Sequence, residues 1–304
     1  VILMEKLDSV FNWMIQQEIP CARKEPMSRH TSFKIGGPAE IYCTPKNPKQ
    51  LQDIRDYCAQ EGVRTYLLGK GTNVLFSDKG YDGVVVRIGD AFSAIEVQGT
   101  VLKAGAGASL SKVCLAAAEA GLAGMEFAFG IPGCVGGAVY MNAGAYGGEI
   151  KDILRDVTFL DDKGHEITLE AGALSLGYRT SAFAYMPWCI LSATFSLTPG
   201  DKDSIREQMA DYARRRTEKQ PLDMPSAGST FKRPEGAYAS ALIDQCGLRG
   251  YAVGDAAISE KHCGFVVNKG NATCADVLCL TDVVAKIVKE QTGFTLEKEI
   301  RVVE

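Results

Sequence analysis

Residues 127–148, FAFGIPGCVGGAVYMNAGAYGG, are the part of this chain that most constrains its fold. They include seven glycines and no charged residue in twenty-two positions. Glycine loses the most conformational freedom on folding, so such a run needs positive φ angles or a close approach of the backbone to another group. Asn142 and Tyr146 are almost its only polar side chains, which leaves most polar recognition to backbone amides. The segment is therefore predicted to line the site of a large ligand.

A second glycine turn, GKGTN at residues 69–73, follows a short apolar strand. Successive backbone amides in such a turn form a concave nest that suits phosphate oxygens. One glycine loop alone is more often a simple turn, but two in one chain favour a nucleotide site. Neither matches GxGxxG at a helix start or GxxxxGK[ST], because Lys70 is followed by Gly71. A Rossmann or P-loop site is therefore not expected.

The two loops belong to a set of five motifs that follow one another along the chain. They are GKGTNVL (69–75), GIPGCVGGAVYMNAGAYGGE (130–149), GYRTSAF (177–183), AGSTFKRP (227–234) and LEKEIR (296–301). Together they resemble the successive motifs of the UDP-N-acetylenolpyruvoylglucosamine reductases, from about His30 to the C-terminus. The resemblance implies an α+β fold, with an FAD-binding domain of the p-cresol-methylhydroxylase type in two α/β subdomains and a C-terminal α+β substrate domain. Only 49 residues lie between Arg179 and Ser229, so the chain resembles the shorter, type II branch.

The same resemblance implies an activity. It is the reduction, with NADPH and non-covalently bound FAD, of the enolpyruvyl group of UDP-N-acetylglucosamine-enolpyruvate to the lactyl ether of UDP-N-acetylmuramate. This step belongs to peptidoglycan precursor synthesis, and hence to cell-wall biogenesis, cell shape and cell division. Two alternatives are a flavin oxidase or dehydrogenase of the same FAD-domain superfamily and a non-catalytic nucleotide-binding module. The oxidases commonly attach their flavin covalently through histidine or cysteine, but neither glycine loop contains a histidine. A nucleotide-binding module without flavin would be distinguished by being colourless.

Reducing this double bond needs hydride at the β-carbon, stabilisation of the developing enolate-like charge, and a proton at the α-carbon. By resemblance, Arg179, Ser229 and Glu299 are the catalytic arginine, the proton donor and the catalytic glutamate. Arg179 offers a permanently charged planar fork for the substrate carboxylate. Ser229 is expected on a tight turn, and Glu299 would polarise the carboxylate. Because a serine hydroxyl is a weak acid, a neighbour such as Lys232 would have to activate Ser229.

The motifs also assign binding residues. Those expected to contact the cofactor are Gly69, Lys70, Gly71, Thr72, Asn73, Ile131, Pro132, Gly133, Gly136, Gly137, Asn142, Gly144 and Tyr146. Those expected to contact the substrate are Tyr178, Lys232, Arg233, His262 and Arg301. Arg301 is two residues from Glu299 on a predicted last strand, so both should share one face, with Arg301 on the diphosphate or carboxylate. The basic run 214–219 is the alternative for the diphosphate, although such a run is more often a solvated helix face.

Composition is that of a water-soluble enzyme. The 304 residues carry a net charge of −4, so no basic field indicates nucleic acid or an anionic membrane. No uncharged run reaches the length of a membrane span without interruption by glycine or proline, and because charges begin at Glu5 no signal peptide is expected. The ten cysteines include no CxxC pair, which predicts free thiols and no metal site. A cytoplasmic, monomeric protein is expected.

Hydrophobic periodicity and helix-end signals predict the remaining elements. Helices are expected at 4–18, 48–61, 109–121 and 203–219. Strands are expected at 66–69, 84–88, 95–98, 101–104, 153–160, 165–170 and 190–197. The sequence Pro199-Gly200-Asp201 suggests a boundary between an FAD-binding region, 1–200 with subdomains at about 20–90 and 91–200, and a substrate domain, 201–304. A β-α-β-β-α-β pattern is expected near the C-terminus.

Overall fold

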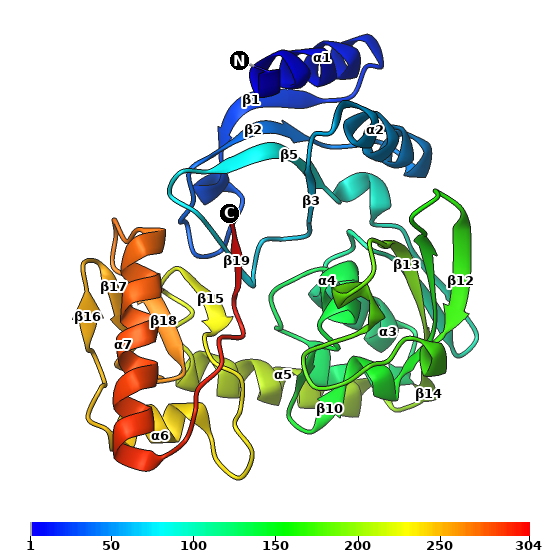
Figure 1. The fold of residues 1–304 in the computed structure, drawn as a ribbon. Helices are drawn as coiled ribbons and strands as arrows, with labels where there is room; N and C mark the ends of the chain where they lie inside the picture. The colour runs from blue at the N-terminus through cyan, green and yellow to red at the C-terminus, as the bar shows by residue number, and fades with distance from the viewer. Residues whose placement is uncertain (1) are drawn as a thin grey trace. The chain divides into compact units, whose positions relative to one another are not determined.

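The structure, a computed structural model, describes residues 2–304 (Figure 1). Its α-helices are α1 (Ile2–Gln16), α2 (Pro48–Glu61), α3 (Leu110–Glu119), α4 (Val135–Tyr140), α5 (Lys202–Lys219), α6 (Ala239–Gln245) and α7 (Cys274–Thr292). Its strands are β1 (Cys21–Pro26), β2 (Pro38–Cys43), β3 (Thr65–Leu68), β4 (Val74–Phe76), β5 (Tyr81–Arg87), β6 (Ile95–Gln98), β7 (Val101–Gly105), β8 (Leu122–Ala123), β9 (Gly144–Ala145), β10 (Gly148–Glu149), β11 (Leu154–Leu160), β12 (Glu166–Glu170), β13 (Cys189–Ser196), β14 (Thr198–Pro199), β15 (Ser226–Ser229), β16 (Ala252–Val253), β17 (Ala256–Ile258), β18 (Phe265–Asn268) and β19 (Arg301–Val303). Short 3-10 helices occur at Met27–Arg29, Asp90–Phe92, Glu126–Ala128, Ile150–Asp152, Ala171–Ala173 and Ala182–Ala184.

The chain divides into two compact units, each built from three separate segments. Unit 1 contains Val1–Ala22, Tyr42–Lys70 and Val84–Arg215, and unit 2 contains Arg23–Ile41, Gly71–Gly83 and Arg216–Glu304. The division passes along β1, β2, β5 and α5, whose residues belong partly to each unit. Both units combine helices and sheets, and the expected α+β fold with an FAD-binding domain is confirmed.

Helix α2 shows how local sequence sets an element's limits. The Asn47 side chain accepts a hydrogen bond from the amide of Gln50, and Pro48 occupies the first turn, where its missing N–H costs nothing. Gly62 ends the helix at φ 67°, a left-handed angle that glycine adopts without strain. The predicted limits, 48–61, are confirmed. The neighbouring sheet has the strand order β1-β2-β5-β3.

Unit 1 is organised around a five-stranded sheet in the order β12-β11-β13-β7-β6, with every neighbouring pair antiparallel. Helix α4 packs against β13 and β7. Phe159 is fully buried, and its ring lies 4.5 Å from the ring centroid of Trp188. The strands predicted at 153–160, 165–170 and 190–197 are therefore confirmed as β11, β12 and β13.

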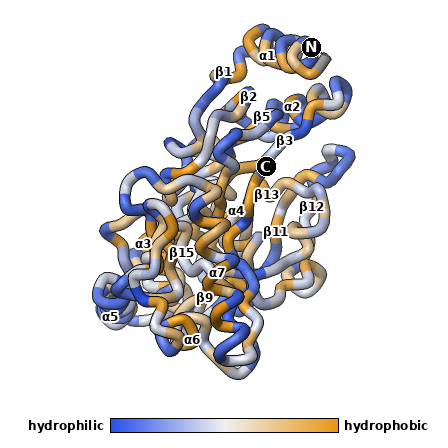
Figure 2. The backbone as a smooth tube through the Cα atoms, turned by 60° about the vertical axis from the view of Figure 1, so that its left-hand side comes forward, coloured by the Kyte–Doolittle hydropathy of each residue, from blue (hydrophilic) through white to orange (hydrophobic). Residues whose placement is uncertain are grey.

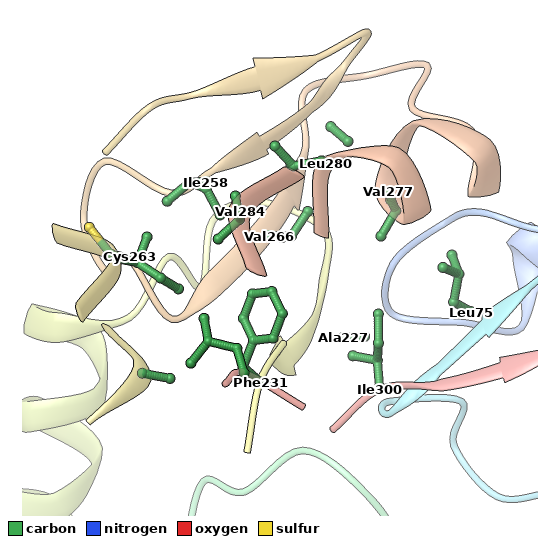
Figure 3. Close-up of a cluster of buried hydrophobic side chains, with 14 of the residues drawn as sticks. Leu75, Ala227, Phe231, Ile258, Cys263, Val266, Val277, Leu280, Val284 and Ile300 are labelled. Atoms are coloured by element: carbon green, nitrogen blue, oxygen red, sulfur yellow. The ribbon is translucent and has the colours of Figure 1, made fainter. Parts of the chain in front are cut away.

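Unit 2 contains a four-stranded sheet, β15-β18-β17-β16, packed with α6 and α7 around one apolar cluster. Figure 3 shows Phe231, Val266, Val277 and Val284 gathered in this core. Helix α7 begins with a capping box between Thr273 and Asp276. Within the same unit, β19 pairs in parallel with β4. The C-terminus is thus tied to the segment that follows the glycine loop at residues 69–73.

The C-terminal prediction was partly wrong. The observed order, β15-α6-β16-β17-β18-α7-β19, contains one more strand than β-α-β-β-α-β, namely the two-residue β16. The last strand begins at Arg301, so Glu299 precedes it. The prediction that both residues share one face of a strand therefore loses its geometric basis. Helix α5 does follow the prediction at 203–219 and is polar along its length (Figure 2).

Candidate active site

The glycine-rich segment of unit 1 forms a loop, the short helix α4 and a hairpin of β9 and β10. Packing within the unit explains part of its glycine content. A Cβ at Gly136 would meet Ala106 at 3.0 Å, and one at Gly148 would meet the Phe127 ring at 2.6 Å. At Gly137 an added Cβ would have only one neighbour, at 3.8 Å. This part of the backbone therefore leaves room for another group.

Ile131, Pro132 and Gly133 form the loop that enters α4. Gly133 adopts φ 152°, and its carbonyl accepts a hydrogen bond from the amide of Leu110. The loop is thereby attached to the start of α3. The cofactor contacts expected of Ile131, Pro132 and Gly133 stay predictions.

The tip of the β9–β10 hairpin carries Tyr146 in a strained conformation. Tyr146 and Gly147 have φ angles of 53° and 88°, as in the two-residue turns that usually contain asparagine and glycine. The Tyr146 ring stacks on Tyr212 of α5, with centroids 4.4 Å apart and planes 1° from parallel. Its hydroxyl also donates to the Tyr212 carbonyl at 3.3 Å. Strain of this kind in a non-glycine residue is typical of functional sites, and the predicted cofactor contact of Tyr146 stays a prediction.

Tyr178 and Arg179 occupy a tight turn in unit 1. Across this turn, the backbone N–H of Gly177 donates to the carbonyl of Thr180, and the N–H of Thr180 donates to the carbonyl of Gly177. Arg179 adopts φ 56°, and its Nη2 donates to the carbonyl of Gly144 at 3.2 Å. Its guanidinium carbon lies 5.1 Å from the Tyr178 ring centroid. The sequence motif thus marks a constrained turn that presents a half-buried arginine.

The glycine loop at residues 69–73 is held closely by its surroundings within each unit. In unit 1, a Cβ at Gly69 would meet the Cys134 sulfur at 2.8 Å. In unit 2, Gly71 adopts φ 64°, and a Cβ there would lie 2.1 Å from the carbonyl oxygen of His30. Asn73 Nδ2 donates to the carbonyl of Glu299 at 3.3 Å, and the Asn73 carbonyl accepts from the amide of Arg301. Lys70 is exposed, and Thr72 lies beside Gly71 in the same loop.

Replacing Gly71 with alanine is expected to destabilise the apoprotein far more than the same change at Gly99. Both glycines have left-handed angles, φ 64° and 59°, but Gly99 has no atom within 4 Å of an added Cβ. Gly99→Ala should cost only the left-handed penalty, about 1–2 kcal/mol. Gly71→Ala adds a collision with backbone. The measurement is the free energy of unfolding in urea, and equal losses for the two variants would contradict the close contact.

In unit 2 the segments that carry Ser229 and Glu299 lie side by side. The amide of Glu299 donates to the carbonyl of Thr230 at 2.8 Å, and Phe231 bridges to Lys298. Thr230 is itself buried and fixed, because its amide donates to the carbonyl of Gly264. The segment that carries Glu299 therefore runs antiparallel to the one that carries Ser229.

Ser229 does not lie on the predicted tight turn. It is the exposed last residue of β15, whose pairing with β18 shifts register between Ser226 and Ser229. Gly228, at φ 75°, supplies the left-handed angle of this bulge. Bulges commonly lie beside active sites, where they redirect a side chain. The hydroxyl is therefore presented by a distorted strand.

The predicted substrate residues of unit 2 differ in their surroundings. Lys232 Nζ lies 3.2 Å from a Glu297 carboxylate oxygen, and the Arg233 guanidinium lies 3.9 Å from the Tyr238 ring centroid. Arg301 is exposed on β19. These contacts show where each side chain is held, and the roles in substrate binding stay predictions.

His262 accepts a hydrogen bond on Nδ1 from the amide of Gly264 at 3.1 Å. This bond places the ring proton of the neutral form on Nε2. Burial lowers the pKa of His262, so the neutral ring is favoured. His262 therefore has a structural contact, and its place in substrate binding stays a prediction.

Burial makes at least three of the cysteines unreactive. All ten cysteines are free thiols, and burial raises the pKa of Cys58, Cys114 and Cys189 to about 12. Such thiols stay protonated and unreactive at neutral pH. Within residues 2–304, no group of three or more His, Cys, Asp or Glu residues is placed to hold a metal ion. Nor does any helix of that range combine the length and apolar character needed to cross a membrane.

Sequence reasoning missed three side chains around the Arg179 turn and hairpin. Tyr212 stacks on Tyr146 from α5, Glu149 bonds to Asn142, and Ser181 bonds to the Tyr140 carbonyl. Glu149 and Ser181 lie inside the recognised motifs but have no role assigned by them. Non-glycine residues with positive φ cluster in this region. This feature is visible only in the structure, so the sequence offered no comparable signal.

Comparison with known proteins gives two family matches. Residues 39–170 match an FAD binding domain, and residues 220–303 match the C-terminal domain of UDP-N-acetylenolpyruvoylglucosamine reductase. All the predicted cofactor residues fall in the first range. Ser229, Glu299 and Arg301 fall in the second.

Curated relatives and a crystal structure agree with these matches. A UDP-N-acetylenolpyruvoylglucosamine reductase of Agathobacter rectalis is 47% identical over 312 residues, covering 98% of this chain and 99% of the relative. One from Caldanaerobacter subterraneus subsp. tengcongensis is 46% identical, covering 99% and 98%. The crystal structure of the Thermus caldophilus enzyme superposes with a TM-score of 0.79 at 33% identity, covering 94% of this chain and 99% of that one.

Proposed function

The chain belongs to the UDP-N-acetylenolpyruvoylglucosamine reductase family, and we propose that it reduces the enolpyruvyl group of a UDP-sugar to a lactyl ether with NADPH and FAD. At the level of residues, the observation that carries the proposal is the backbone pairing of Thr230 with Glu299. This pairing supports the proposal because the segments that carry the predicted proton donor and the predicted catalytic glutamate lie side by side. The near full-length relatives favour this reductase over a flavin oxidase or a nucleotide-binding module.

The residues present fit the cofactor. The FAD-binding match spans both glycine loops. Backbone amides of residues 69–73 can surround phosphate oxygens, and Gly137 leaves space in the glycine-rich segment 127–148. Bound FAD supplies hydride transfer between NADPH and the β-carbon of the enolpyruvyl group.

Arg179 binds and polarises the substrate carboxylate in this proposal. Negative charge grows on the carboxylate and the adjoining carbons during reaction, and a fixed guanidinium stabilises it more strongly in the transition state than in the ground state. The left-handed turn and the bond to the Gly144 carbonyl support this role, because they restrain the arginine before substrate arrives.

Ser229 delivers the proton to the α-carbon, and Glu299 hydrogen-bonds the substrate carboxylate. The exposed hydroxyl at the end of β15 supports the first role. The half-buried Glu299, held through both its backbone N–H and its carbonyl, supports the second. Lys232 or another group of unit 2 raises the acidity of the serine in this scheme.

The purified protein is expected to be yellow and to release intact FAD on acid or heat treatment. The reason is that both glycine loops lack a histidine for covalent attachment. Absorbance spectra before and after precipitation, with chromatography of the released flavin, provide the measurement. Flavin that stays on the denatured chain, or FMN in place of FAD, would contradict the expectation.

Arg301→Ala should mainly raise KM for the UDP-sugar, whereas Glu299→Gln should mainly lower kcat. Arg301 is assigned to a fixed charge of the substrate, and losing such a charge-assisted bond corresponds to roughly a tenfold to hundredfold loss of affinity. Glu299 is assigned to a group whose charge changes during reaction, so its effect belongs to the transition state. Steady-state kinetics with saturating NADPH distinguish the two patterns.

Arg155→Ala is the control for these variants, because Arg155 is an exposed arginine of unit 1 paired with Asp156 and has no assigned role. Its kinetic constants should stay unchanged. If Arg301→Ala leaves KM unchanged, the basic residues at the end of α5 become the candidates for the diphosphate.

The biological setting is part of the proposal. The product would enter peptidoglycan precursor synthesis, and through it cell shape and division. We also propose a cytoplasmic monomer of the shorter family branch, with FAD binding mainly before residue 200 and substrate binding mainly after it. Sedimentation of the FAD-loaded protein tests the monomer.

A further inference from the structure

Two fully buried polar side chains of unit 1, Asn142 and Ser181, flank the turn that presents Arg179. Neither is exposed to solvent. Burying a polar group is costly unless its hydrogen bonds are made. Asn142 makes its hydrogen bonds to Gly177, Glu149 and Lys151, and Ser181 makes its own to Tyr140.

Asn142 connects three stretches of backbone. Its Nδ2 donates to the carbonyl of Gly177 at 2.9 Å and to a Glu149 carboxylate oxygen at 3.0 Å. Its Oδ1 accepts from the amide of Lys151 at 2.9 Å. Both amide hydrogens are thus used within the protein, so the contribution of this side chain to the site is positional.

Glu149 completes the same network. Lys151 Nζ lies 2.7 Å from its Oε2. This hydrogen bond to Lys151, followed by the one from Asn142 and the nearby charge of Arg179, keeps the pKa of Glu149 below its usual value. The acceptor that Asn142 needs therefore stays ionised at neutral pH.

Ser181 holds the other side of the turn. Its Oγ donates to the carbonyl of Tyr140 at 2.7 Å, and Tyr140 is the last residue of α4. Gly177 is therefore fixed through Asn142, which follows α4, and Ser181 is fixed to the end of α4 itself.

The residue between these anchors is under strain. Arg179 adopts φ 56°, an angle that is unfavourable for a non-glycine residue and persists only where the surroundings enforce it. Its guanidinium donates to the carbonyl of Gly144, which belongs to the hairpin that Asn142 and Glu149 hold. The two anchors thus fix both the backbone and the head group of the arginine.

We propose that Asn142 and Ser181 form a clamp that positions Arg179 for the substrate carboxylate. The inference rests on the proposed role of Arg179. Both are positioning residues, because each acts through the turn and the hairpin.

The test uses the FAD-loaded enzyme and follows the two half-reactions separately by stopped flow. Asn142→Asp keeps the shape of the side chain but replaces both N–H donors with oxygen, and Ser181→Ala removes one hydroxyl. Each is expected to slow flavin reoxidation by the UDP-sugar, by up to about a hundredfold for a displacement of about 1 Å. Flavin reduction by NADPH should stay within about twofold of wild type in Ser181→Ala, whose residue has no assigned cofactor contact. Ser181→Ala is the milder change and decides the result if Asn142→Asp does not fold or does not retain FAD.

Coupling to Arg179 separates positioning from a general loss of structure. In an Arg179→Ala background, each clamp variant should slow reoxidation by less than about threefold, since nothing remains to be positioned. Asn268→Asp is the matched control. Asn268 is also buried, donates to the Phe33 carbonyl and accepts from two backbone amides, but in unit 2. Its effect, if any, should be the same with and without Arg179.

Three outcomes decide the matter. Slowing that is lost in the Arg179→Ala background supports the clamp. Equal slowing in both backgrounds, or no slowing by Ser181→Ala, overturns it. If Arg179→Ala itself leaves reoxidation unchanged, the proposed role of Arg179 fails, whatever the clamp variants do.

Discussion

Replacing Ser229 with alanine is expected to slow reoxidation of the flavin by the UDP-sugar about a hundredfold to ten-thousandfold, the range for loss of a general acid. Reduction of the flavin by NADPH should proceed at nearly the wild-type rate. The asymmetry follows from the assigned role, because a proton is delivered to the substrate α-carbon only when the enolpyruvyl group is reduced. Stopped-flow absorbance of the two half-reactions measures both rates.

Ser226→Ala provides the control within the same strand. Ser226 begins β15 and pairs with Val267 of β18, while Ser229 ends the strand beyond the bulge. The Ser226 variant should leave both half-reactions unchanged. Equal slowing of both half-reactions by Ser229→Ala would show that the serine supports the bulged strand and does not deliver a proton.

Replacing Arg179 with alanine is expected to slow the same half-reaction about a hundredfold to a thousandfold, as loss of one preorganised charge-stabilising group does. The reason is that Arg179 stabilises charge that appears on the substrate. Steady-state measurement should show a lower kcat together with a lower kcat/KM, the pattern of an interaction made mainly in the transition state.

Arg179→Lys refines this expectation. Lysine keeps the positive charge but lacks the planar fork that binds a carboxylate through two hydrogen bonds. Its rate should therefore lie between those of wild type and Arg179→Ala. A lysine variant as slow as alanine would make the bidentate geometry decisive, and an alanine variant with normal kcat would place Arg179 outside the reaction.

Much of the fold follows from local sequence, because the signals concerned act over a few residues. The limits of α2 are set by Asn47, Pro48 and Gly62, which are all visible in the sequence. The glycine loops were recognised in the same way. Their glycine content was interpreted only as room for a ligand. At Gly136 and Gly148, glycine is instead required by close packing against Ala106 and Phe127, which only the folded chain reveals.

The rest depends on pairings between distant segments. The bulge before Ser229 depends on the register with β18, and the start of β19 at Arg301 depends on its pairing with β4, more than two hundred residues away. Asn142 was assigned to the cofactor from its motif. Its hydrogen bond to the carbonyl of Gly177 joins residues 35 positions apart, and no local sequence pattern predicts such a contact.

Enolpyruvyl reduction by this protein can be tested in an anaerobic single turnover of the purified, FAD-loaded protein. One equivalent of NADPH should bleach the flavin, and enolpyruvyl-UDP-N-acetylglucosamine should then restore its absorbance with formation of UDP-N-acetylmuramate. UDP-N-acetylglucosamine, which lacks the double bond, should leave the flavin bleached. Reoxidation by both sugars, or by neither, would contradict the assignment of this chain as the enolpyruvyl reductase.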